Sequence, residues 1–360
     1  MNCRINNCVS SRIKNLKIYK GLKENKLLAE LINNAINKGL RAYSKNLSRK
    51  YDIRKTIIIS GVHRGGTTWL LEILLNSLPL PCGISEPLSL TSSKYQDKRI
   101  KELNFSPKQY IEVKQDWKDA EALMKDVLTG ANINLFNVFS DSILEYFKKM
   151  TKSNIYIVKF CRANRMLEWM VNKFKLNNTI LLIRHPCAVV ASQLSHGGWN
   201  NVIRNSIVEY PVVNQKFVDK EPWVKKIIKD CKAPEEKLAL TWCLDFFIPL
   251  SVVEPHPWIL TSYEKLVQNG EEELNKIIKR LGYKTPKDIN KYLEKPSSST
   301  RFDSNVTKGR NRLSGWKEKL DKGQIERILA IVSKFGLDFY TDDLEPDYER
   351  LYNNPMIRKG

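Results

Sequence analysis

One segment of the chain has the residue types and spacing needed to bind a phosphate-like oxyanion. It reads TIIISGVHRGGTTWLLEILL (56–75), a short apolar run followed by a glycine-bearing turn and a helical pattern. Glycines let a backbone wrap closely round an anion, and the N-terminus of the next helix offers unpaired N–H groups. The segment adds hydroxyls and a fixed positive charge, and its anion-binding candidates are Gly61, Arg64, Gly65, Gly66, Thr67 and Thr68.

The same segment differs from the Walker A pattern of nucleoside triphosphatases. Its glycine spacing fits, but Thr67 stands where that pattern has lysine, and the basic residue lies inside the loop at Arg64. Kinases also use Mg²⁺ held by an acidic residue, whereas two later predicted strands end in Lys159 and Arg184. A P-loop-type nucleotide kinase is therefore kept as an alternative.

A second pair of anion-binding residue types follows the predicted strand at 179–183. Arg184 ends this strand, and Ser192 lies two turns into a helix that begins near Pro186. Both side chains could reach one phosphate, although alone the pair would be an ordinary solvated strand end.

Together the two segments resemble the sulfotransferases that depend on 3′-phosphoadenosine 5′-phosphosulfate (PAPS). GVHRGGTTWL (61–70) is similar to the family's 5′-phosphosulfate loop, G-x-[PR]-[KR]-S-G-T-T-W-L. The resemblance implies that Arg64 contacts the bridging and sulfuryl oxygens and that Thr67 and Thr68 bind phosphate. The second segment is similar to the 3′-phosphate motif R-[DN]-P-x-x-x-x-x-S, and Arg184 and Ser192 match its phosphate-binding residues.

Three positions depart from these family patterns. In the loop, Gly65 replaces the usual serine and His63 the usual proline, while His185 replaces the Asp or Asn of the second motif. The lost hydroxyl would change the rate or the timing of cofactor engagement. The backbone cradle, which includes Gly66, would remain.

Aromatic and basic residues further along extend the resemblance. Trp69 and Tyr263 match positions near the adenine ring. The segment TKGRNRLSGWKEKL (307–320) resembles the loop that closes over the 3′-phosphate, with its Gly–Trp spacing one residue short. Either Arg310 or Arg312 would supply the contact to that phosphate.

Sulfuryl transfer to a hydroxyl needs a base for the acceptor proton and positive charge for the leaving phosphate. Cytosolic small-molecule members place a histidine two residues after a lysine, but here Cys161 occupies that position after Lys159. Carbohydrate-type members carry a K-x-x-R run, matched by Lys159 and Arg162, and an E-P dipeptide, matched at Glu86. The resemblance implies Glu86 as general base and Lys159 as a helper. His63 is the other candidate base, since imidazole titrates near neutral pH.

The elements that must position these residues follow an α/β order. Short β-branched runs are expected as strands at 56–60, 155–159, 179–183 and 258–262. Helical patterns follow at 67–78, 165–174, 187–194, 234–253 and 262–282. This alternation predicts an α/β, P-loop-like three-layer fold with a central parallel sheet flanked by helices. The more irregular segments 91–150 and 200–234 are expected as insertions near the ligand end.

The composition bounds the possible partners. Lys and Arg number 60 against 39 Asp and Glu, a net charge of +21 that attracts polyanions. A non-catalytic polyanion-binding protein is therefore a further alternative. No zinc pattern, RNA-binding aromatic signature or heptad is present, so nucleic acid is not an expected partner. The expected donor is PAPS, which would leave adenosine 3′,5′-bisphosphate as product. The expected acceptor is a hydroxyl on a saccharide or glycolipid, and no metal is expected.

Three regions are expected: a basic helical N-terminal extension (1–52), the sulfotransferase domain (53–340) and a polar C-terminal tail (341–360) that frays. Residues 27–43 are amphipathic and would dock on the domain or lie on a membrane surface. We see neither a signal peptide nor a transmembrane run, and the seven cysteines lack CxxC spacing. We therefore expect free thiols and a cytoplasmic enzyme, and if it touches the inner membrane face, residues 27–43 would make that contact.

Overall fold

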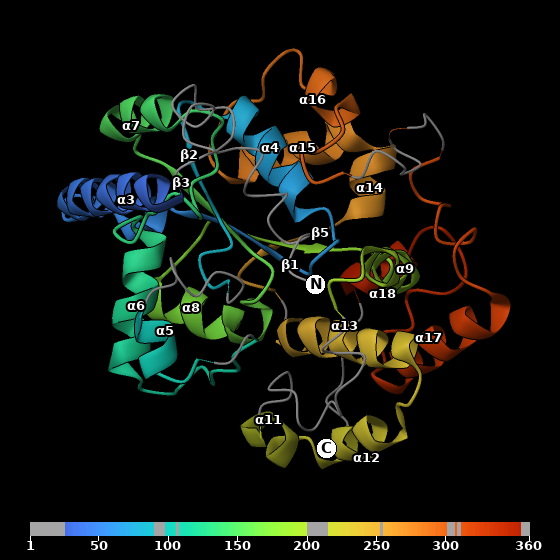
Figure 1. The fold of residues 1–360 in the computed structure, drawn as a ribbon. Coiled ribbons are helices and arrows are strands. Elements are labelled where there is room, and N and C mark those ends of the chain that lie inside the picture. The colour runs from blue at the N-terminus through green and yellow to red at the C-terminus, as the bar shows by residue number, and fades with distance from the viewer. Residues whose placement is uncertain are drawn as a thin grey trace.

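The computed structural model describes residues 26–89, 98–105, 108–199, 215–252, 255–300, 307 and 311–353. Its centre is a parallel sheet with helices on both faces, in the strand order β2-β3-β1-β4-β5 (Figure 1). The strands are β1 (Ile57–Gly61), β2 (Cys82–Ser85), β3 (Tyr156–Phe160), β4 (Thr179–Ile183) and β5 (Ile259–Ser262). The predicted α/β class is confirmed.

The helices lie on both faces of this sheet and in the segments between its strands. From the N-terminus to β4 they are α3 (Lys26–Ser48), η1 (Ile53–Lys55), α4 (Thr67–Ser77), α5 (Lys98–Glu102), α6 (Lys118–Leu128), α7 (Ile143–Lys152), η2 (Asn164–Met166) and α8 (Leu167–Phe174). After β4 they are α9 (Pro186–His196), α11 (Gln215–Lys220), α12 (Pro222–Asp230), α13 (Pro234–Leu250), α14 (Tyr263–Gln268), α15 (Gly270–Arg280), α16 (Asn290–Glu294), α17 (Lys322–Lys334) and α18 (Tyr348–Asn353).

The strands are apolar on both faces because helices cover both sides of the sheet. Ile57 and Ile59 of β1 belong to one hydrophobic core, which also contains side chains of α4 and α15. Ile58, between them, points the opposite way into a second and larger core that includes α8, α9 and α13. This alternation follows the two-residue period of a strand.

The carboxyl ends of all five strands meet at one edge of the sheet. At this edge β1 lies between β3 and β4, so the chain reverses its direction of strand addition around β1. Ligands of open α/β sheets bind at such a reversal, outside the carboxyl ends of the strands. The phosphate-binding residues predicted from sequence follow β1 and its neighbour β4, at this point of the edge.

The secondary-structure expectations are mostly confirmed, with two differences. The four predicted strands are present within one residue, while β2 was not predicted because Cys82–Ser85 is a short mixed run. The helix expected over 262–282 is divided between α14 and α15, since Asn269 leaves helical geometry. The five cysteines among the described residues are free and buried.

Helix α3 docks on the domain through both apolar and polar side chains. Asn37 Oδ1 accepts a hydrogen bond from the Leu135 amide at 2.8 Å, and Ser44 Oγ donates to the Ala131 carbonyl at 3.2 Å. Leu40 is fully buried, whereas Leu31 is 58% exposed. The docked face thus adds buried polar contacts to the apolar stripe that the periodicity predicted. Among the described residues, no helix combines the length and apolarity that a membrane crossing requires.

The expected fraying after residue 340 is wrong for the described part of the tail. The carbonyl of Thr341 lies 3.0 Å from His185 Nε2, and Leu351 of α18 is buried against the domain. Polar composition hid these few anchoring contacts.

Candidate active site

Residues 61–68, called the phosphate loop after their predicted role, contain the tight turn that their glycines predicted. After β1, the Gly65 amide donates to the Val62 carbonyl at 2.9 Å, which closes a tight turn. Gly66 is the N-cap of α4 with φ +92°, a left-handed conformation that favours glycine. A Cβ on Gly66 would lie 2.5 Å from Tyr263 Cδ2, so a side chain here would also displace that ring. No side chain caps the N-terminus of α4, which leaves its first N–H groups directed at the loop.

The two loop threonines point to different neighbours. Thr67 is buried, with Oγ1 3.4 Å from Cys161 Sγ at the end of β3. Thr68 Oγ1 accepts a hydrogen bond from Lys159 Nζ at 3.4 Å. The loop and the C-terminal end of β3 therefore form one continuous surface.

The two anion-binding segments meet in space, although Arg64 and Ser192 are far apart in sequence. Arg64 Nε donates to Ser192 Oγ on α9 at 2.9 Å. Arg184 Nη1 donates to the Arg64 carbonyl at 2.9 Å, so the guanidinium from β4 also holds the phosphate loop. The structure thus places two arginines, a serine and a helix N-terminus at one point of the sheet edge.

Aromatic rings form one wall beside these cations. Trp69 and Tyr263 lie with ring centroids 5.4 Å apart, and the Arg184 guanidinium lies 4.1 Å above the Tyr263 ring. Arg312 lies 5.6 Å from the Trp69 ring and donates to the carbonyl of Leu293 at 3.0 Å. Of the two predicted arginines, Arg312 is therefore near the site, while Arg310 lies outside the described residues.

His185, which departs from the family pattern, has a structural role here. Its Nδ1 accepts from the Cys187 amide at 3.1 Å and so caps α9, the task that Asp or Asn performs at a helix N-terminus. Its Nε2 donates to the Thr341 carbonyl, and its ring stacks on Trp316 with centroids 4.6 Å apart. Burial lowers the pKa of His185 to about 3, which keeps the ring neutral.

Glu86 lies between two cations at the carboxyl edge of β2. Its Oε1 is 3.0 Å from Lys159 Nζ, and its Oε2 accepts from Arg162 Nη1 at 3.1 Å. The Glu86 amide donates to the Lys159 carbonyl at 2.9 Å, extending the β2–β3 ladder, and its φ of +51° turns the chain away. All three residues are largely buried, so this pairing takes place in low dielectric.

These charges set the protonation states of the candidate bases. Burial by itself would raise the pKa of Glu86, but Lys159 and Arg162 outweigh it and hold that pKa far below its usual range. Burial lowers the pKa of His63, and Arg162 lowers it further. At neutral pH Glu86 is a carboxylate and His63 a neutral imidazole, and each has a lone pair for a proton.

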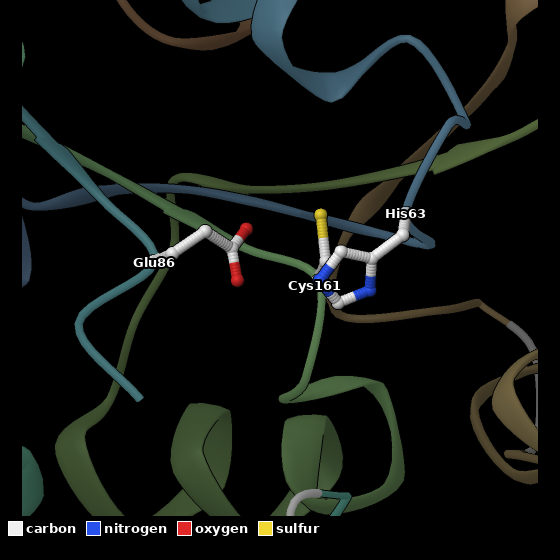
Figure 2. A group of neighbouring side chains, drawn as sticks. All are labelled: His63, Glu86 and Cys161. Atoms are coloured by element: carbon white, nitrogen blue, oxygen red, sulfur yellow. The ribbon is translucent and has the colours of Figure 1, made fainter. Parts of the chain in front are cut away.

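His63, Glu86 and Cys161 lie close together (Figure 2). One possible metal-ligand atom of each residue lies within 4.8 Å of those of the other two. Such a set resembles a zinc-binding trio in its donor types. The neighbouring ammonium of Lys159 and guanidinium of Arg162 oppose a further cation, and burial raises the pKa of the Cys161 thiol to about 12. The positive charges of Lys159 and Arg162 beside this trio therefore favour an anionic ligand over a metal ion.

A second buried ion cluster lies next to this site and was not predicted from the sequence. Asp245 of α13 accepts from Arg165 Nε at 2.8 Å and also pairs with Lys108. Asn164, beside Arg165, accepts from Ser60 Oγ at 2.7 Å, so η2 is fixed to the end of β1. No local pattern links Lys108, Arg165 and Asp245, which come from three distant segments.

Comparisons with known proteins give a distant likeness only. No family model and no curated protein matches the sequence. The sulfotransferase domain of the olefin synthase of Synechococcus PCC 7002 aligns with 14% identity and a TM-score of 0.42, covering 82% of this chain and 98% of that one. The sulfotransferase domain from the curacin biosynthetic pathway aligns with 16% identity and a TM-score of 0.40, covering 78% and 96%.

Proposed function

We propose that the chain is a PAPS-dependent sulfotransferase. The observation that carries this proposal is the meeting of Arg64, Ser192 and Arg184 at the N-terminus of α4. Two motifs that resemble phosphate sites supply those residues, one after β1 and the other after its neighbour β4. A donor with phosphate at both its 3′ and 5′ positions requires two anion sites this close together.

The residues suit the parts of such a donor. The N-terminus of α4, Gly65, Gly66, Thr67 and Thr68 would bind the 5′-phosphosulfate through N–H and hydroxyl donors, with Arg64 adding positive charge. Arg184 and Ser192 would hold the 3′-phosphate, and the Trp69–Tyr263 wall would pack on the adenine ring. Arg312, or Arg310, would close the 3′-phosphate side.

The proposed transfer needs a base, a nucleophile and a stabilised leaving group. Glu86 takes the proton of the acceptor hydroxyl while the oxygen of that hydroxyl forms a bond to sulfur. The bond from sulfur to the 5′-phosphate oxygen breaks, and Arg64, Lys159 and the helix N–H groups stabilise the charge left on that oxygen. The products are a sulfate ester and adenosine 3′,5′-bisphosphate.

The ion pairs of Glu86 bear on its strength as a base. A carboxylate held by Lys159 and Arg162 is weakly basic, because both cations favour its charged form. Lys159 also reaches Thr68 at the phosphate loop, where an arriving sulfuryl group would compete for it. Donor binding would therefore strengthen the base. His63 remains the second candidate base.

The acceptor is proposed to be a saccharide or glycolipid hydroxyl. The E-P dipeptide at Glu86 and the K-x-x-R run of Lys159 and Arg162 support it, because carbohydrate-type members carry both.

Leu28 and Leu31, exposed on α3, are the side chains that a peripheral membrane contact would use.

Calorimetric titration with adenosine 3′,5′-bisphosphate tests the proposal, with ATP plus Mg²⁺ in parallel. We expect the bisphosphate to bind and Arg184→Ala to weaken it at least tenfold, since one charge-assisted contact contributes ~1.5–3 kcal/mol. Arg280→Ala, which removes an exposed arginine at the end of α15, is the matched control and should bind normally. Binding of ATP without binding of the bisphosphate would refute the proposal in favour of the kinase alternative.

A further inference from the structure

The carboxyl edge of the sheet holds more buried positive than negative charge. Glu86 is shared by Lys159 and Arg162, at 3.0 Å and 3.1 Å. Residues 159–165 continue from this pair into η2, where Arg165 contacts the second cluster. The same short segment therefore supplies three of the cations.

The second cluster repeats the imbalance of the first. Asp245 is shared by Arg165, at 2.8 Å, and by Lys108, which comes from the segment between α5 and α6. Across both clusters, counted over the part of the chain that the structure describes, four cations face two carboxylates, a surplus of two positive charges. Burying charge without a counter-charge is costly, so a surplus at this depth favours a bound anion.

The proposed donor accounts for one side of this surplus only. Lys159 reaches Thr68 of the phosphate loop, so the phosphosulfate would engage that ammonium. Lys108 instead contacts Asp245 on α13. Burial and repulsion by Arg165 and Arg162 lower the pKa of Lys108, which identifies it as a cation whose charge Asp245 does not fully compensate.

The accessible part of the two clusters lies beside the proposed base. The side chains of Asp245 and Arg165 are each only 2% exposed. Lys108 and Arg162 are each 14% exposed, and Glu86 is 17% exposed. The surplus charge therefore meets solvent where an acceptor hydroxyl would approach Glu86. His63 lies at the same place, and the proximity of Arg162 and Lys108 helps to keep its ring neutral.

We infer that the acceptor carries an anionic group, a carboxylate or a sulfate or phosphate ester, and that Lys108 and Arg162 bind it next to Glu86. This inference rests on the proposed function, because it describes that enzyme's acceptor. Lys108 is then a specificity-determining residue, supplied by the insertion between β2 and β3. A neutral acceptor would leave its charge only partly compensated, by Asp245.

Titration of inorganic sulfate into enzyme already saturated with PAPS tests the inference, because the sulfuryl position is then occupied. We expect one sulfate per chain and at least a tenfold weaker affinity in Lys108→Met, which keeps the apolar stem but removes the charge. Asp245 retains Arg165 in this variant, and thermal unfolding checks its fold. Lys108→Arg should retain the affinity within about threefold, since it restores the charge. Lys114→Met, an exposed lysine of the same segment, is the matched control and should match the parent chain.

The outcomes separate the two proposals. No sulfate binding to the PAPS-saturated enzyme, or equal binding by the parent chain and Lys108→Met, would overturn the anionic acceptor while leaving the sulfotransferase proposal in place. Failure of PAPS itself to bind would remove the sulfotransferase proposal. The unliganded chain would then be titrated with sulfate, and loss of binding in Lys108→Met alone would still establish an anion site at Lys108.

Discussion

At the residue scale, Glu86 is a carboxylate whose position is fixed by its backbone and by both of its oxygens. Glu86→Gln keeps the shape but cannot accept a proton. We expect turnover to fall by a factor of about 10²–10⁴, the usual contribution of a general base. The affinity for adenosine 3′,5′-bisphosphate should stay within about threefold, because its binding residues are unchanged. Full activity in this variant, with loss of activity in His63→Gln, would assign the base to His63.

The pH dependence of kcat/KM follows from the direction of the two pKa shifts. Glu86 and His63 both have lowered pKa values, so each stays unprotonated at lower pH than an ordinary carboxylate or imidazole would. Activity should therefore persist from about pH 8 down to about pH 5 without a decline near pH 6.5, the usual pKa of histidine. The bisphosphate affinity, measured at each pH, separates catalysis from binding. A decline centred near pH 6.5 would show an unshifted histidine acting as base.

At the element scale, the turn from β1 into α4 depends on Gly66. Gly66→Ala places a Cβ in a left-handed conformation and 2.5 Å from the Tyr263 ring. We expect a loss of unfolding free energy of at least about 2 kcal/mol and bisphosphate binding weakened tenfold or more. Gly282→Ala is the matched control, since Gly282 also has positive φ but nothing within 4 Å of the added Cβ. It should cost about 1 kcal/mol and leave binding unchanged, whereas equal effects would dismiss the Tyr263 contact.

Sequence periodicity predicted those elements that bury a continuous apolar stripe. The apolar run of β4 and the glycine turn after β1 are local signals, and both led to correct positions. The β2 strand gave no such signal, because its pairing with β3 stabilises a run of only four residues. Helix α3 was predicted as an amphipathic helix, but the contact of Asn37 was not predicted, because it depends on a backbone amide nearly a hundred residues away.

At the scale of the whole molecule, the features that were missed are contacts between distant segments. Lys108 and Asp245 pair across 137 positions of the chain, and His185 and Thr341 across 156. In neither pair does the sequence around one residue indicate which distant residue it contacts. The candidate phosphate-binding residues could be proposed from sequence because each motif is short. The charge balance around Glu86 depends instead on how α13 and the insertion after β2 are placed.

The C-terminal segment also reaches the predicted 3′-phosphate motif through one buried carboxylate. Glu264 of α14 accepts from the His185 amide at 3.0 Å and from the Tyr340 hydroxyl at 2.9 Å. Tyr340→Phe leaves the Glu264 Oε2 without this donor, so we expect the free energy of unfolding to fall by ~1–3 kcal/mol in chemical denaturation. Because α9 begins beside His185 and carries Ser192, bisphosphate affinity should fall severalfold as well.

Tyr348→Phe is the matched control, since the Tyr348 hydroxyl donates to the more accessible Glu345. This variant should lower the free energy of unfolding by less than about 1 kcal/mol, without a change in affinity. Equal losses in the two variants would mean that the tail stabilises the domain without supporting the anion site.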